Sequence, residues 1–177
     1  MIARSLLVAA MLLGLVGAAA AGENRTPFVA YGFGCAQLPG EVSVTGNTLH
    51  IRNLTNFGFI VSDNALVNGP ITVWVSININ LKENAGDFAG TLELRPTALG
   101  GEGTWVGSFG GHLKGGKYGA SPLTLVDARI IAQGTGVLEG QKLMFDHFVN
   151  TAIAAPDPPP GCPVVVGEFW QGDIIQP

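Results

Sequence analysis

The feature that most constrains the fold is a strict alternation of apolar and polar positions over residues 71–81. The apolar positions are Ile71, Val73, Val75, Ile77, Ile79 and Leu81, and the alternate positions are Thr72, Trp74, Ser76, Asn78 and Asn80. Successive side chains of a strand point to opposite faces, whereas a period of two cannot gather apolar residues on one face of a helix. The segment is therefore predicted to be a long, half-buried β-strand.

The rest of the chain carries the same pattern in shorter pieces. Gly46-Asn47, between the apolar positions of residues 42–44 and 49–51, predicts a tight hairpin. Further strands are expected at residues 28–34, 55–61, 88–94, 104–109, 123–132, 141–149 and 164–171. The glycine-rich residues 100–120 form either a flexible rim or bent strands. With 26 glycines, 11 prolines and no long amphipathic helical period, the chain predicts an antiparallel barrel or sandwich.

The N-terminus has the layout of a secretory signal peptide. Arg4 precedes a short apolar run, and the small residues that follow end in an alanine triplet that fits a cleavage site at Ala21. We expect residues 1–21 to be a signal peptide and residues 22–177 to be one β-barrel domain, secreted or periplasmic. An uncleaved anchor is the alternative, although the apolar run is short for a membrane span. No later stretch approaches that length, so no membrane span is expected after cleavage.

Cys35 and Cys162 lie near the two ends of the mature domain. In an exported protein such a pair most simply forms a disulfide. Two free thiols or a redox site are the alternative, but the sequence has no C-x-x-C motif. A bridge would make the two termini spatial neighbours, as a closed barrel requires. We therefore predict an all-β fold, a single antiparallel β-barrel whose termini are tied by one disulfide.

Two glycine-containing segments give the chain a family resemblance. Residues 103–108 read GTWVGS and residues 134–140 read GTGVLEG. This strand-and-turn pattern resembles that of small exported proteins with an allene oxide cyclase-like barrel, an architecture shared by the dirigent proteins of plants. The resemblance extends over residues 61–148. It implies an eight-stranded antiparallel barrel with an apolar lumen, and it carries over no functional residue.

Charge and motif content argue against several classes of function. The formal net charge is −4 and the few Lys and Arg residues are dispersed, so we do not expect nucleic acid as a partner. Residues 111–117 have the lysine spacing of a phosphate-binding loop, but Tyr118 stands where Ser or Thr must bind magnesium. His50, His112 and His147 lack metal-ligand spacing. We therefore expect neither a metal nor a cofactor.

Glu139, Asp127 and His112 are the candidates for catalysis. A carboxylate enclosed in an apolar lumen could act as a general acid or base. The alternative for Asp127 is that it marks, with Arg129, the solvent face of a strand. This alternative is favoured by the regular apolar positions at residues 126, 128, 130 and 132.

Trp74, Trp105, Phe109 and Tyr118 are the candidates for ligand binding. Aromatic side chains near the mouth of a barrel can line a pocket, and neighbouring glycines leave room for a ligand. Core packing explains the same residues without a ligand.

No complete catalytic motif occurs, so we expect a non-catalytic exported barrel that binds a small apolar molecule or a partner. One alternative is an isomerase or cyclase that folds an apolar substrate inside the lumen. Another is a structural or adhesive domain that acts through its outer face. A titratable side chain inside an enclosed pocket would favour the enzyme, and a contiguous exposed apolar patch would favour the adhesive domain.

Overall fold

The computed structural model describes residues 23–114, 124–150, 157, 159–162 and 168–177. The predicted signal peptide lies outside these residues. Within them, no helix has the length and apolar content that crossing a bilayer requires. The described elements are, in chain order, β1 Asn24–Leu38, β2 Glu41–Thr45, β3 Thr48–Ser62, β4 Gly69–Asn80, β5 Ala85–Leu94, the 3₁₀ helix η1 Thr97–Leu99, β6 Gly103–Lys114, β7 Thr124–Gly136, β8 Lys142–Asn150 and β9 Glu168–Gln176.

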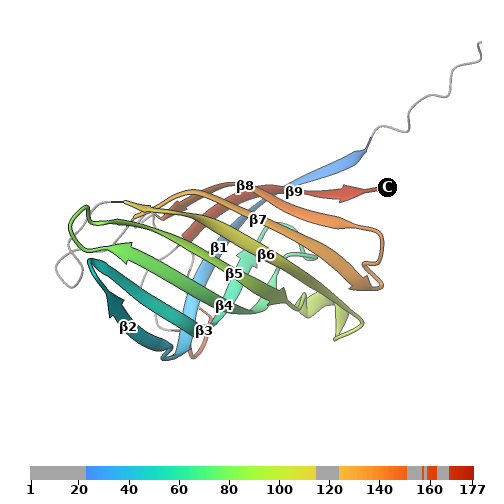
Figure 1. Ribbon diagram of the computed structural model, residues 1–177. Coiled ribbons are helices and arrows are strands. Elements are labelled where there is room, and N and C mark those ends of the chain that lie inside the picture. The colour runs from blue at the N-terminus through green and yellow to red at the C-terminus, as the bar shows by residue number, and fades with distance from the viewer. Residues whose placement is uncertain (1–22, 115–123, 151–156, 158, 163–167) are drawn as a thin grey trace, which may run out of the picture.

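The strands form one antiparallel sheet that closes on itself (Figure 1). Their order is β1-β9-β8-β7-β6-β5-β4-β3-β2, and an additional pairing of β1 with β3 closes a ring of eight strands. β2 extends the sheet beyond the ring, beside β3. Closure pairs strand edges that would otherwise be exposed. The predicted all-β antiparallel barrel is confirmed.

The ring strands are tilted relative to the barrel axis. The stagger is seen by going from each residue to its partner on the next strand. Starting from Gln37 on β1, this path passes once round the ring and reaches β1 again at a different residue, Thr26. The intermediate partners are Asn56, Val73, Leu92, Gly107, Ala132, Leu143 and Ile174. Such a stagger is what barrel closure requires. A barrel of eight strands has an interior that side chains can fill or that can hold one small ligand.

The alternation in residues 71–81 produces β4, which ends at Asn80. Ile71, Val75 and Ile79 are buried, whereas Trp74 is 42% exposed on the opposite face. The glycine-rich stretch forms the strand β6 from Gly103 to Lys114, and its register against β7 shifts between Gly110 and His112. This favours bent strands over a flexible rim for this part. The rest of the stretch, from residue 115, lies outside the described residues.

β3 corrects one prediction, because residues 49–51 and 55–61 belong to a single strand. Asn53 has a left-handed φ of 56°, and the register against β4 shifts between Ile51 and Leu54. Asparagine tolerates this conformation better than most residues, so the strand bends and continues. The predicted hairpin is confirmed: Thr45 pairs with Thr48, and Gly46 has a φ of 60°.

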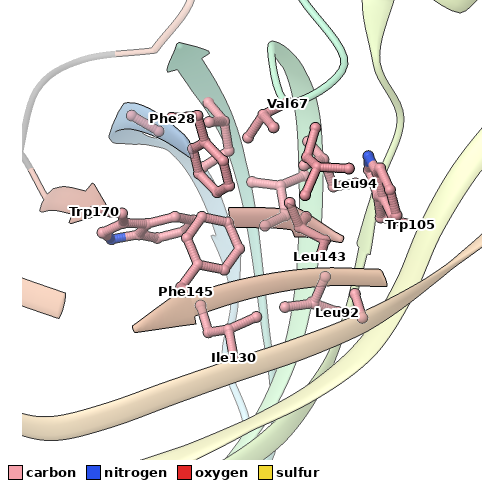
Figure 2. Close-up of a cluster of buried hydrophobic side chains, with 14 of the residues drawn as sticks. Phe28, Val67, Leu92, Leu94, Trp105, Ile130, Leu143, Phe145 and Trp170 are labelled. Carbon is pink, nitrogen blue, oxygen red and sulfur yellow. The ribbon is translucent and has the colours of Figure 1, made fainter. Parts of the chain in front are cut away.

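One end of the barrel is filled by a cluster of large buried side chains, which we call the plug (Figure 2). Its main members are Phe28, Val67, Leu94, Trp105, Leu138, Leu143, Phe145 and Trp170. The Phe145 ring makes edge contacts with Phe28 and Trp170, at centroid distances of 5.1 and 4.9 Å. Burying each such side chain stabilises the fold by about 1.5–3 kcal/mol.

Trp105 also ties the β3–β4 connection to the plug. The Trp105 side chain is fully buried, and its indole N–H donates to the backbone oxygen of Leu66 at 2.7 Å. Val67, beside Leu66, is itself buried in the plug. The β3–β4 connection therefore covers the end of the barrel at which β3 ends and β4 begins.

A disulfide joins Cys35 of β1 to Cys162, which precedes β9 and lies 127 residues later in the chain. β1 also pairs directly with β9, from Asn24 opposite Gln176 to Gly32 opposite Glu168. The two ends of the domain are thus joined covalently and by hydrogen bonds, which confirms the predicted bridge. In the entropic treatment a cross-link over so long a loop stabilises the fold by at most about 5 kcal/mol.

Candidate functional site

The barrel contains a cavity of about 530 Å³. Its walls come from β1, β3, β4, β5, β6, β7 and one side chain of β9, Trp170. Trp170 is also part of the plug, so the cavity adjoins the plug within the lumen. A volume of this size lies within the range of about 300–1,000 Å³ that is typical of small-molecule sites. The cavity is therefore the leading candidate for a functional site.

The wall of the cavity is almost entirely apolar. Its apolar side chains are Phe33, Ala36, Leu54, Phe57, Ile71, Val73, Val75, Ile77, Phe88, Leu92, Phe109, Leu113, Ala128, Ile130 and Trp170. The rings of Phe88 and Phe109 are 6.0 Å apart, and Phe109 joins the plug to the second buried cluster around Val75 and Leu113. Among the described residues that line the cavity, none has a titratable side chain. A charged group in this space would lose its hydration without a compensating partner.

Two amide side chains form the polar part of the wall, Gln37 of β1 and Asn56 of β3. Gln37 lies opposite Asn56, and Asn56 lies opposite Val73, so the three belong to one cross-strand row that faces the lumen. Asn56 is half-buried and Gln37 is exposed. The cavity therefore meets solvent near the end of β1.

A bulge in β1 decides which of its side chains lies in the cross-strand row of Asn56, although residues 33–37 all line the cavity. The register against β3 shifts between Gly34 and Ala36, so Gly34 is opposite Gly58 and Ala36 is opposite Phe57. An extra residue in one strand interrupts its alternation. Gln37, rather than Ala36, consequently joins the inward row of Asn56.

The three candidates for catalysis are not brought together in the cavity. Glu139 is exposed in the turn between β7 and β8, at the plugged end of the barrel. His112 is exposed on β6, where its Nδ1 contacts the carboxylate of Asp87 at 2.5 Å. Asp127 lies in β7, and its side chain is outside the described part of the structure. The cavity thus gains no titratable group from Glu139 or His112.

The four aromatic candidates for ligand binding occupy different places. Phe109 lines the cavity, whereas Trp105 is in the plug. Trp74 is on the outer face of β4, where it could contact only a molecule bound outside the barrel. Tyr118 lies outside the described residues.

A second, polar hollow of about 370 Å³ lies on the outer face beside Asp87 and His112. In the same cross-strand row, Asn78 lies opposite both Asp87 and His50. The Oδ1 of Asn78 accepts a hydrogen bond from Arg52 Nη2 at 2.6 Å and lies 2.8 Å from His50 Nδ1. These side chains contact one another across neighbouring strands, and we call them the outer polar ladder. Such cross-strand contacts stabilise a sheet, so they account for the polar groups without a ligand. Among the described residues, no three His, Cys, Asp or Glu side chains are grouped as a metal site.

Arg52 has a structural task in that ladder. Its guanidinium donates to the backbone oxygens of Ile51 and Ile77, each at 3.0 Å, where the β3–β4 register shifts. Without these donors, a buried backbone oxygen that has no hydrogen-bond partner in the neighbouring strand would lower the stability of the fold. The outer polar ladder therefore stabilises the bent part of β3.

Comparisons with known proteins provide no independent guide to function. No protein-family model, curated protein or solved structure matches the chain.

Proposed function

We propose that this protein is an exported β-barrel that binds a small, largely apolar molecule in its cavity without transforming it. The observation that carries the proposal is the cavity of about 530 Å³, whose described lining is apolar apart from two amides and the disulfide. Apolar walls with a few placed polar groups are typical of small-molecule sites. Removing the apolar surface of a ligand from water would supply the main driving force.

The proposed place of action is outside the cytoplasm, in the periplasm or the extracellular medium. The sequence of residues 1–21 has the organisation of a signal peptide. The disulfide between Cys35 and Cys162 supports this location, because such bonds persist mainly in oxidising compartments.

The contrasting hypothesis is an isomerase or cyclase of the kind suggested by the resemblance to allene oxide cyclase-like barrels. Such an enzyme would use the lumen to restrict the substrate and a polar group to stabilise developing charge. Glu139 and His112 lie outside the cavity, at a turn and on the outer face. The geometry therefore supports binding better than catalysis, and kinship with that family remains a proposal.

A second candidate function, interaction through the surface, is favoured by β2. Among the described strands β2 pairs only with β3, and its Val42 and Val44 are 62% and 59% exposed. In an antiparallel pair of two copies centred on Ser43, each Val42 would face Val44 of the other copy, and Glu41 would face Thr45. Such a register avoids like charges and pairs an edge that has no partner among the described strands. The partner that fits β2 is thus a second copy of this chain.

Sedimentation velocity of the mature protein tests the second candidate. A dimer that dissociates in the Val44→Lys variant would support it, since lysine on an edge strand opposes pairing. A protein that stays monomeric at high micromolar concentration would rule it out.

Titration with diphenylhexatriene, an uncharged hydrocarbon that fluoresces in apolar surroundings, tests ligand binding. The blocking variant is Gly34→Phe, because Gly34 lines the cavity and an added Cβ there meets no atom within 4 Å. The matched control is Ala89→Phe, on the exposed face of β5. Wild type and Ala89→Phe should bind one probe per chain with similar affinity, and Gly34→Phe should bind at least tenfold more weakly.

Two results would contradict the proposal. One is the absence of saturable probe binding to the wild-type protein. The other is equal binding by the blocking and control variants, which would place the probe outside the cavity. Native mass spectrometry of gently purified protein then identifies any molecule that the cavity retains.

A further inference from the structure

The cavity has a polar end whose chemistry is uniform. Gln37 and Asn56 lie opposite each other in the β1–β3 register and both line the cavity. Each side chain is a primary amide, which offers a carbonyl acceptor and an amino donor. Within the described part of the chain, neither side chain has a hydrogen-bond partner. The pair can therefore both donate to and accept from one group of a ligand.

Because Asn56 is half-buried, a ligand group that forms a hydrogen bond with its amide should contribute to the free energy of binding. Asn56 stands in a row with Val73 and Leu92, both of which line the cavity. Filling the cavity with an apolar molecule alone would displace water from this amide without replacing its hydrogen bonds, and an unsatisfied polar group of this kind is costly. A hydroxyl or carbonyl group at the polar end would remove this cost.

The absence of charge sets the second limit on the ligand. No Lys, Arg, His, Asp or Glu occurs among the described residues that line the cavity. A carboxylate or ammonium group entering it would be desolvated without an opposite charge, which is strongly unfavourable. Neutral amides cannot compensate as an arginine would.

The volume sets the approximate size. A molecule that fills about 530 Å³ at the density of a protein interior, about 0.74, has about 20 non-hydrogen atoms. Its apolar body would lie against Leu92, Phe109 and Ile130, and reach towards Trp170.

We propose that the cavity selects an uncharged amphiphile with an apolar body and one hydrogen-bonding head, and that Gln37 and Asn56 bind this head. The inference rests on the proposed binding function and specifies its ligand class. Long-chain alcohols, ketones and esters belong to this class, whereas fatty-acid anions and alkylammonium ions do not.

Displacement of bound diphenylhexatriene by matched twelve-carbon competitors tests the inference. The competitors are 1-dodecanol and dodecanoate, at a pH where the carboxylate is ionised. Wild-type protein should bind the alcohol at least tenfold more tightly than the anion. In the Gln37→Leu/Asn56→Leu double variant, the affinity for the alcohol should fall about tenfold. The hydrocarbon probe should bind at least as tightly as to the wild type, because it no longer leaves an amide unsatisfied.

Gln133→Leu is the matched control, because Gln133 is an exposed glutamine on the outer face of β7. It should leave the affinity for the alcohol unchanged. If the double variant does not fold, Asn56→Leu alone replaces it in the test, and this single variant should lose part of the affinity for the alcohol.

The outcomes separate the inference from the proposed function. If the wild-type protein did not bind the probe, the proposed binding function itself would be overturned. Intact probe binding combined with equal affinities for alcohol and anion would overturn only the head-group inference. The same holds if the leucine variants keep the full affinity for the alcohol.

Discussion

Trp105→Phe should destabilise the protein although it replaces one aromatic side chain by another. Trp105 is fully buried, and its indole N–H donates to the backbone oxygen of Leu66 at 2.7 Å. Phenylalanine cannot donate this bond, which costs about 1–2 kcal/mol when the acceptor stays in the plug. Its ring is also roughly 40 Å³ smaller, and at about 24 cal/mol per Å³ the residual void adds about 1 kcal/mol. The expected loss is about 2–3 kcal/mol.

Urea unfolding followed by far-ultraviolet circular dichroism measures this loss. With a denaturant slope of about 2 kcal/mol/M, the midpoint should fall by about 1–1.5 M. Trp74→Phe is the control, because Trp74 is 42% exposed on the outer face, and its change should stay within about 0.5 kcal/mol. Probe binding should be retained in both variants, since neither side chain lines the cavity. Equal midpoints for wild type and Trp105→Phe would refute the assignment of Trp105 to the plug.

Three further predictions concern closely packed glycine, the disulfide and export. Gly90→Ala should be strongly destabilised or fail to fold, because its Cβ would overlap the backbone oxygen of Trp74. The free energy of unfolding of Gly34→Ala should stay within about 0.5 kcal/mol of the wild-type value. Similar thermal midpoints for the two variants would contradict the packing. The Cys35→Ser/Cys162→Ser variant should lose up to about 5 kcal/mol in urea unfolding, and reduction of the wild type should reproduce the loss; insensitivity to reductant would count against the bridge. Mass spectrometry of the protein purified from its host should find an N-terminus at Gly22. A chain that retains Met1 would disprove cleavage at Ala21.

The sequence predicts much of the fold because alternation is a local property. In β4 the apolar positions are buried at Ile71, Val75 and Ile79, as a period of two requires. The division of β3 into two strands was wrong because Asn53 absorbs the bend in a left-handed conformation. Whether an asparagine continues a strand or ends it depends on its neighbours in the sheet, which the sequence does not specify.

The position of the cavity could not be predicted in the same way. The height of a side chain along the barrel axis depends on the stagger of all eight ring strands. Trp105 and Phe109, which belong to one strand, therefore have different surroundings: Trp105 is in the plug and Phe109 is on the cavity wall. Gln37 was missed for a second reason. A bulge after Gly34 shifts the alternation of β1 and brings Gln37 into the inward row.

We propose that the apolar cavity of the closed barrel holds a neutral amphiphile. A crystal structure of the mature protein with 1-dodecanol tests it most directly. We predict electron density for the alkyl chain against Leu92, Phe109 and Ile130, with the hydroxyl within hydrogen-bonding distance of Gln37 or Asn56. A lumen filled by side chains, or an alcohol bound only outside the ring, would contradict the account.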